Sequence, residues 1–291
     1  MSKPAPVASR IASIRQRLLD RARARGEDFQ LVLDRFAVER LLYRLSISVH
    51  SDQFLLKGAL LFALWFDQQH RPTRDADLLG FGPPDAERLK KVIVELCAME
   101  SDDGLRFDVG SIGVEPIREE AAYEGLRARL VAFLGESRCH VQWDVGFGDA
   151  VTPGPQEVEY PVMLDEFQPP RLRVYPRETV FAEKLEAIAT LGIANSRMKD
   201  YFDLLALSRE QAMDLMVLAV AIRATFERRG TALPDGMPFG LTEAFATDAQ
   251  KQAQWNAFLR RNRLSAPDLE AVVDELRTFV RTLNLQAETH D

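Results

Sequence analysis

The chain has 291 residues, of which 46% are hydrophobic and 28% charged, and its formal net charge is −7. That length allows one large domain or two modest ones, and the composition is ordinary for a soluble globular protein. It excludes a helical membrane span, because no apolar stretch is long enough, and a protein that simply coats nucleic acid is disfavoured by the negative charge. With two cysteines and no apolar signal core, we expect a cytoplasmic protein without a membrane partner.

The N-terminal segment predicts two helices, at 8–25 and 28–49, from apolar residues at helical spacing. Six arginines and one acidic residue lie between residues 10 and 25. One interpretation is a solvated helix face. The other is a contact with the phosphate backbone of RNA, in which Arg171, Arg173 and Arg177 would join.

The remainder of the chain divides into a mixed part and a helical part. Glycine and proline turns separate short strands expected at 54–57, 75–79, 112–118, 126–134, 138–146 and 158–164. A helix is expected at 84–99, and helices dominate from residue 178, at 178–191, 198–208, 210–228, 248–260 and 266–284. The expected fold class is α+β, a mixed sheet with flanking helices followed by a helical C-terminal half.

Residues 54–79 carry the most specific chemical pattern. An apolar run ends in Lys57-Gly58, and a polar connection then leads to Asp75-Ala76-Asp77 at the start of a second apolar run. On a strand, Asp75 and Asp77 point to one face, roughly 7 Å apart. Neighbouring carboxylates suit a hard cation such as Mg²⁺, and a glycine before a helix lets backbone approach phosphate. The pattern therefore predicts a triphosphate-and-metal site.

This pattern resembles the nucleotidyltransferase superfamily and, more closely, the AbiEii/AbiGii toxin family of bacterial type IV toxin–antitoxin systems. The resemblance is carried by Leu56-Lys57-Gly58 and by Arg71-Pro72-Thr73-Arg74-Asp75-Ala76-Asp77-Leu78. Ala59 stands where the family usually has a second glycine. Two later segments are similar to further motifs of the family, Glu183-Lys184-Leu185-Glu186-Ala187 and Arg197-Met198-Lys199-Asp200-Tyr201-Phe202-Asp203-Leu204.

The resemblance implies a Mg²⁺-dependent nucleotidyltransferase that uses an NTP. The metal would be held by Asp75, Asp77 and Asp144, the last on the polar face of the alternating strand at 138–146. Residues implied for triphosphate binding are Lys57, Gly58, Thr73, Arg74 and Lys184. Asp200, preferred over Asp203, would act as the catalytic base beside Asp75, Asp77 and Lys184.

Structural alternatives stay open for several of these residues. Asp144 is alternatively a surface or turn-capping residue, with Asp108 and Asp149 as weaker candidates for the third carboxylate. Lys184 falls on the inward stripe of its helix, where it needs an anionic partner or lies at the edge of the core. Asp200 is alternatively a residue that stabilises the first turn of a helix.

The expected elements and the resemblance together indicate an organisation and a function. The order of elements, apart from the resemblance, predicts helices at 1–50 that pack on a nucleotidyltransferase-like catalytic domain at 51–175. A helical domain at 176–291 would contribute Lys184 and Asp200, with the proline-rich stretch 166–176 as the seam. The activity would be transfer of a nucleotide to RNA, at the 3′ end of tRNA, which blocks translation. A separately encoded antitoxin would be the protein partner.

Three alternative functions are weighed against this one. A small-molecule nucleotidyltransferase of the antibiotic-modifying type would keep the site and change the acceptor. A kinase would transfer the γ-phosphate to a protein hydroxyl. A non-enzymatic protein that binds a partner is disfavoured, because the acidic residues of the site are present.

Overall fold

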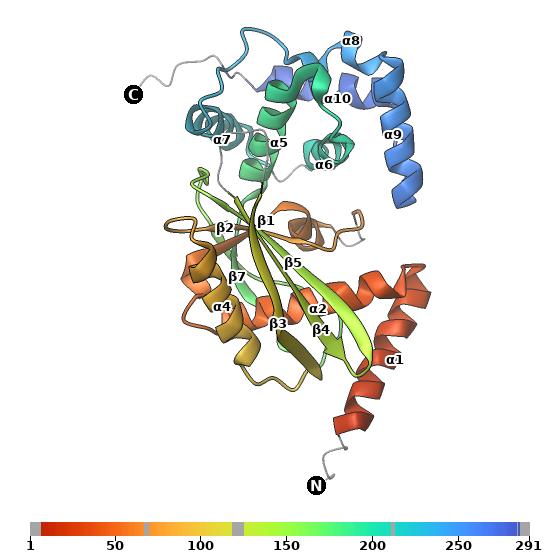
Figure 1. Cartoon of the computed structure of the whole chain (residues 1–291). Coiled ribbons are helices and arrows are strands. Elements are labelled where there is room, and N and C mark those ends of the chain that lie inside the picture. Colours follow the sequence, from red (N-terminus) through yellow and green to blue (C-terminus); the bar gives the residue numbers. More distant parts are fainter. Residues whose placement is uncertain (1–6, 67–69, 118–124, 211–212, 284, 286–291) are drawn as a thin grey trace. The chain divides into compact units, whose positions relative to one another are not determined.

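The computed structural model describes residues 7–66, 70–117, 125–210, 213–283 and 285 (Figure 1). Positions 118, 211–212 and 284, which belong to predicted elements, lie outside these residues. The chain divides into two compact units. Unit 1 comprises Met1–Gly148 and Gln156–Val174, and unit 2 comprises Asp149–Pro155 and Tyr175–Asp291.

Unit 1 is built, within its described residues, on a seven-stranded mixed sheet of order β3-β4-β5-β2-β1-β7-β6 (Figure 1). The strands are β1 (Phe54–Lys57), β2 (Ala76–Gly80), β3 (Leu105–Ile117), β4 (Gly125–Leu134), β5 (Ser137–Phe147), β6 (Gln156–Glu159) and β7 (Arg171–Val174). The pairs β2/β5 and β1/β7 are parallel, and the other neighbours are antiparallel. The chain is therefore α+β, as predicted.

Helices of unit 1 pack beside this sheet, and one of them lies at the end of β4 and β5 (Figure 1). They are α1 (Val7–Arg25), α2 (Phe29–Ser46), the short α3 (Phe62–Trp65) and α4 (Ala86–Ala98), with a 3₁₀ turn, η2, at Gly58–Leu61. Both α2 and α4 pack on the sheet and on each other. The buried carboxylate of Asp34 on α2 accepts the backbone N–H of His140 at 2.8 Å, which joins α2 to β5. The turn after β4 lies against α1, where Arg15 Nε donates to Ser137 Oγ at 2.8 Å.

Strands predicted from alternation occur, but their limits differ. β3 begins seven residues before the predicted 112–118, and β6 ends before most of the predicted 158–164. β7 lies in the proline-rich stretch 166–176, where no strand or helix was predicted. Four residues between prolines are weak evidence for a strand, and β7 is stabilised by pairing with β1 and β6, which are distant in sequence.

Unit 2 is helical in its described residues. It contains α5 (Arg177–Leu191), α6 (Met198–Ser208), α7 (Leu215–Arg228), α8 (Glu243–Ala246), α9 (Ala249–Asn262) and α10 (Leu269–Thr282). Only the one-turn α8 was not predicted. Three of the helices begin where an aspartate side chain accepts backbone N–H groups of the first turn, which explains their sharp starts: Asp214, Asp248 and Asp268.

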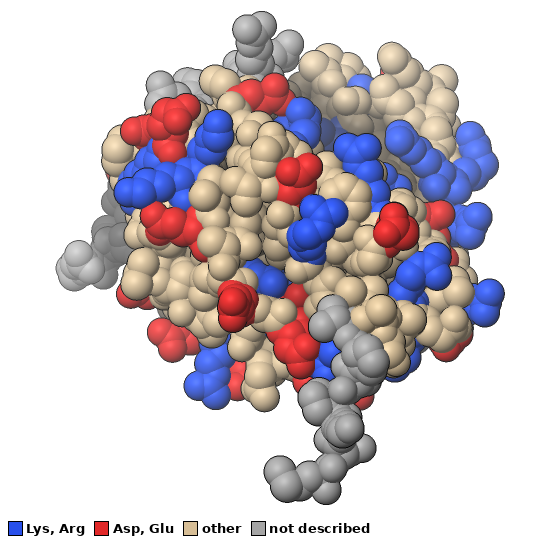
Figure 2. All heavy atoms as spheres, turned by 60° about the horizontal axis from the view of Figure 1, so that its bottom comes forward, with Lys and Arg blue, Asp and Glu red and all other residues tan. Residues whose placement is uncertain are grey.

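Charge is mixed rather than segregated on the surface drawn in Figure 2, where basic and acidic side chains are interspersed. This distribution agrees with the small negative net charge of the chain. Any contact with a polyanion on this face must therefore use local groups of arginine or lysine instead of a field of one sign.

The buried carboxyl group of Glu39 joins α2 to the segment after β6. Its Oε2 accepts the backbone N–H of Met163 at 2.7 Å, and its Oε1 lies 3.5 Å from Arg40 Nη1. Burial raises the pKa of Glu39 to about 7, against the smaller opposing effects of the Met163 hydrogen bond and Arg40.

Replacement of Glu39 by glutamine should change how stability depends on pH. Because folding raises the pKa of Glu39, its stabilising contribution is full below pH 4.5 and is lost as pH rises through about 7. The difference in free energy of unfolding between Glu39→Gln and the native protein should therefore shift in favour of the variant by roughly 3 kcal/mol from pH 4.5 to pH 8.5. Denaturant unfolding at both pH values measures this, with the exposed Glu136→Gln as control. A pH-independent difference would contradict it.

Candidate active site

Four charged residues form a row across adjacent strands on one face of the sheet. In register, Lys57 on β1 lies opposite Asp77 on β2, and Asp77 lies beside Asp144 on β5. Asp144 in turn lies opposite Arg127 on β4. Register partners share a face of the sheet, whereas the alternating positions are buried in the core: Ala76, Leu78, Trp143 and Val145. The two central aspartates are therefore flanked by one cationic residue on each side.

Gly58 lets the backbone come close to the carboxylate of Asp77. Its φ is +73°, in the region that side chains disfavour, and a Cβ at this position would lie 2.7 Å from Asp77 Cγ, well inside van der Waals contact. Glycine is required twice, by the backbone conformation and by the close approach. The Lys57-Gly58 turn and Asp77 on β2, which are 19 residues or more apart in sequence, thus meet directly. Asp75 immediately precedes β2, which begins one residue after the predicted strand 75–79.

Asp144 is held by a residue that the sequence analysis missed. Arg127 donates to both of its carboxylate oxygens, from Nε at 2.8 Å and from Nη2 at 2.6 Å, and Gln142 Nε2 adds a third hydrogen bond at 3.1 Å. The hydrogen bond to Asp144 raises the pKa of Arg127, and the nearby charge of Asp75 acts in the same direction. The polar positions of the alternating segment 126–134 were the available signal for Arg127.

The donor chemistry of this face fits a magnesium ion in part. Asp75 and Asp77 supply carboxylate oxygens, the ligands that Mg²⁺ prefers. Both oxygens of Asp144 are engaged by Arg127, and among the described residues no group of three or more His, Cys, Asp and Glu side chains is arranged to hold a metal. Asp75 and Asp77 are therefore the better candidates, and the ligand role of Asp144 stays a prediction.

The other candidates of unit 1 differ in position. Arg74 is exposed, and Thr73 is half-buried and lines a cavity. Asp108 accepts the backbone N–H of Gly110 at 3.1 Å and so stabilises its own turn. In unit 2, Asp149 pairs with Arg229 at 3.2 Å, so both weaker candidates for a third carboxylate have structural partners.

Unit 2 brings the later motifs together in one buried cluster. Lys184 Nζ on α5 lies 2.8 Å from Asp200 Oδ1 and 2.7 Å from Asp203 Oδ2, both on α6 and both fully buried. Arg197 Nε lies 2.7 Å from Asp200 Oδ2. Burial by itself would raise the pKa of Asp200, but Lys184 and Arg197 hold it below its ordinary value. The anions that compensate the inward-facing lysine include these two carboxylates.

A family model described as "Nucleotidyl transferase AbiEii toxin, Type IV TA system" matches residues 40–280. The chain belongs to this family. The match covers the charge row of unit 1 and the Lys184 cluster of unit 2, and it begins after α1 and most of α2. No match was found among curated proteins.

Two solved structures from Helicobacter pylori share the fold. A putative nucleotidyltransferase has a TM-score of 0.52 and 14% identity, over 88% of this chain and 96% of its own. The protein JHP933 has a TM-score of 0.51 and 13% identity, over 89% of this chain and 94% of its own. At such identities the likeness concerns the fold alone. No helix in the described part of the chain is long and apolar enough to cross a membrane.

Addition of a methyl group at Gly58 should disturb the site more than the backbone alone requires. Gly26 has a similar φ of +64°, but nothing lies within 4 Å of the position that an added methyl group would take, so Gly26→Ala is a matched control. We expect Gly26→Ala to cost about 1 kcal/mol of stability and Gly58→Ala at least twice as much. Equal losses of stability in the two variants would show that the Asp77 side chain moves aside without a cost in energy.

Loss of the Lys184 ammonium should leave two buried carboxylates without their shared cation. We expect Lys184→Met to lower the free energy of unfolding by about 3–5 kcal/mol at pH 7. The pKa of Asp200 is lower in the folded protein than in the unfolded chain. The ionised Asp200 therefore stabilises the fold at pH values above the pKa of the unfolded chain, and this stabilisation is lost as pH falls through the pKa of the folded protein. The deficit of the variant should therefore shrink below about pH 4, where the carboxyls take up protons.

The control for this change is Lys199→Met, because Lys199 is exposed on the same helix as both aspartates. Its effect should stay within about 0.5 kcal/mol at either pH. Chemical denaturation of the two variants at pH 7 and at about pH 2, which lies below the ordinary pKa of an aspartate, makes the comparison. A Lys184→Met deficit that is small at pH 7, or constant with pH, would argue against the pairing.

Proposed function

We propose that this protein transfers a nucleotide from an NTP to the 3′ end of tRNA in a Mg²⁺-dependent reaction that blocks translation. The observation that carries the proposal is the row of Lys57, Asp77 and Asp144, with the Gly58 backbone against Asp77. Membership of the AbiEii family supports toxin-type nucleotidyl transfer. The RNA acceptor and the metal go beyond that support and are proposed from the chemistry and the resemblance.

The reaction joins the acceptor hydroxyl to the α-phosphorus. The oxygen of the acceptor hydroxyl forms a bond to the α-phosphorus. The bond between the α-phosphorus and the oxygen that bridges it to the β-phosphorus breaks, and pyrophosphate leaves. Such transfers depend on positioning and on charge neutralisation more than on covalent chemistry by the protein. Lys57 and Arg74 would neutralise phosphate charge, the Gly58 backbone would approach it, and Thr73 would add a hydroxyl contact.

Asp75 and Asp77 would hold Mg²⁺, which when bound supplies positive charge at the phosphates and orients them. Arg127 acts on the same face by a different route. Arg127 donates to both oxygens of Asp144 and so neutralises that carboxylate. Its positive charge thereby reduces the repulsion between Asp144 and Asp77.

Lys184 and Asp200 are kept as predicted site residues, with roles that the pairing refines. A carboxylate whose pKa is held below its ordinary value is a weak proton acceptor. The contacts therefore favour Asp200 and Asp203 as residues that position Lys184. The acceptor proton would then pass to a carboxylate of the Asp75–Asp77 pair or to water.

Purified protein with Mg²⁺, total tRNA and NTPs labelled in separate reactions at the α or γ phosphate provides the test. We expect α-label on tRNA, and a decrease of at least about 100-fold in Asp77→Asn, because a charge needed at the reacting phosphates is lost. Asp102→Asn is the control, since Asp102 is an exposed aspartate of the same unit, paired with Arg10.

Other outcomes separate the alternatives. γ-Label on protein without α-label on RNA would indicate a kinase. α-Label on a hydroxylated antibiotic and none on tRNA would indicate a small-molecule nucleotidyltransferase. We further propose that the partner is an antitoxin encoded separately, as the type IV family implies.

A further inference from the structure

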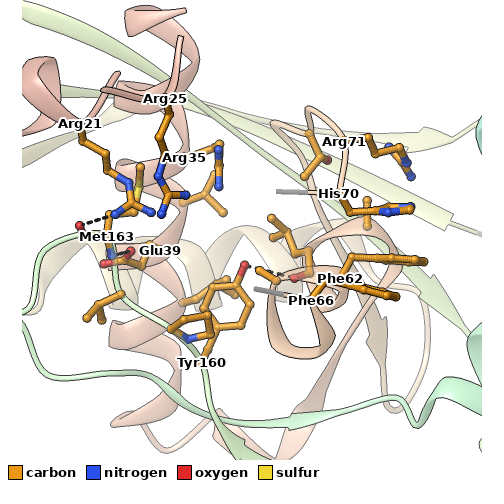
Figure 3. Close-up of a pocket in the computed structure, with 18 residues that line it drawn as sticks. Arg21, Arg25, Arg35, Glu39, Phe62, Phe66, His70, Arg71, Tyr160 and Met163 are labelled. Atoms are coloured by element: carbon orange, nitrogen blue, oxygen red, sulfur yellow. Dashed lines mark hydrogen bonds between the residues drawn. The ribbon is translucent and has the colours of Figure 1, made fainter. Parts of the chain in front are cut away.

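A cavity of about 250 Å³ in unit 1 is lined on two sides by different chemistry (Figure 3). Arg21 and Arg25 from α1 and Arg35 from α2 lie on one side, with their guanidinium groups close together. The rings of Phe62, Phe66 and His70 lie on the other. The arginines precede residue 40, where the family match begins, so this wall is outside the part of the chain that the family model covers.

The arginine side carries an excess of positive charge. The carboxyl group of Glu39, whose pKa is about 7, also lines this side. Burial lowers the pKa of Arg21, and the like charges of Arg25 and Arg35 lower it further, against the smaller opposing effects of Glu27 and Glu39. Arg21 Nη1 donates to the Met163 carbonyl at 3.1 Å and Arg35 pairs with Glu27 at 3.2 Å, so both side chains are held in place. Guanidinium groups fixed in this way suit a phosphate, which accepts several hydrogen bonds from them.

The opposite side is a stack of rings. The Phe62 and His70 centroids are 4.2 Å apart with an interplanar angle of 14°, and Phe66 is near-parallel to both. Phe62 is buried, whereas Phe66 and His70 are half-buried and line the cavity. Such a stack offers a surface to a nucleobase, and base stacking on aromatic rings is the common mode of single-strand recognition.

The cavity adjoins the candidate active site along the chain. Ala59, which follows Gly58, lines it, and Thr73, which also lines it, precedes Asp75 by two residues, a span of at most about 7 Å. The volume is slightly below the ~300–1,000 Å³ of typical small-molecule pockets, which suits a single nucleotide and excludes a duplex. A strand held here would therefore lie next to the acidic pair.

We propose that this cavity binds one nucleotide of a single-stranded RNA acceptor, with its phosphate at Arg21, Arg25 and Arg35 and its base on the ring stack. The inference rests on the proposed function in taking the acceptor to be RNA. It adds a site for the strand that carries the attacking hydroxyl, and it assigns α1 and the start of α2 a role in acceptor binding.

Fluorescence anisotropy of a labelled five-nucleotide single-stranded RNA, without NTP or Mg²⁺, tests the site independently of catalysis. Arg25 is exposed, so Arg25→Ala should fold normally. We expect it to weaken binding about tenfold and to reduce the slope of log K against log salt by about 1. Arg23→Ala is the matched control: Arg23 is exposed on the same helix, two residues away, and does not line the cavity. It should change binding less than twofold.

A second variant tests the ring stack. His70→Ala should weaken the RNA about tenfold and leave the affinity for inorganic tripolyphosphate unchanged, because only the base contacts the rings. Equal losses for Arg25→Ala and Arg23→Ala, or a tripolyphosphate affinity that falls together with that for RNA in His70→Ala, would overturn the proposal. AMP that binds as tightly as the RNA would make this a mononucleotide site and overturn the assignment to an acceptor strand.

The binding assay and the transfer assay fail separately. Transfer of α-label by the native protein, with an unchanged RNA KM in Arg25→Ala, would show that the cavity is not the RNA site and would leave the proposed function intact. RNA binding that depends on Arg25 and His70, without transfer of label to any RNA, would keep the cavity as an RNA site and remove the proposed reaction.

Discussion

The register of β2 between β1 and β5 is the constraint on which the candidate active site depends. A strand alternates its side chains between two faces, so a slip of one residue would place Asp77 in the core and expose Ala76 and Leu78. The burial of those two apolar side chains therefore holds the carboxylate on the open face. Because Lys57 and Asp144 are the register partners of Asp77, the same packing sets the order of charge across the sheet.

Compensation of carboxylates by fixed cations recurs in both units. Arg127 holds Asp144 in unit 1, and Lys184 holds Asp200 and Asp203 in unit 2. Burial or crowding of carboxylates is unfavourable unless a cation lies close by. In unit 2, Lys184 and Arg197 also keep the pKa of Asp200 below its ordinary value. Residues that look alike in sequence thereby differ in their surroundings: Asp200 is paired with Lys184, whereas Asp75 and Asp77 are the carboxylates that we propose hold a metal.

The helix α1 and the start of α2, which precede the part of the chain that the family model covers, contribute three arginines to a cavity that is also lined by aromatic rings. Positive charge occurs on this chain in small groups of side chains, since the net charge is negative and basic and acidic residues are interspersed on the surface in Figure 2. An acceptor strand would therefore be selected by a defined cavity beside the acids instead of by long-range attraction. This arrangement connects the early basic segment of the sequence with the Asp-x-Asp strand through a single unit of structure.

The sequence by itself determined the features that depend on near neighbours along the chain. Apolar residues at helical spacing located the helices, although α7 and α10 begin five and three residues after their predicted starts at 210 and 266. The caps Asp214 and Asp268, which act on N–H groups two or three residues away, set those starts. Alternation defined most strands, and the Lys57-Gly58 and Asp75-Ala76-Asp77 motifs, with the two later segments, indicated the family. These signals are local and survive without knowledge of the fold.

Only the tertiary structure decided which distant residues meet. β7 exists because β1 and β6 pair with it, and Arg127 reaches Asp144 because β4 and β5 are neighbours. The partners of Lys184 and the cavity between α1, α2 and the ring stack depend likewise on contacts across many residues. Pairing of this kind follows from packing of the whole unit, and no spacing within one segment encodes it.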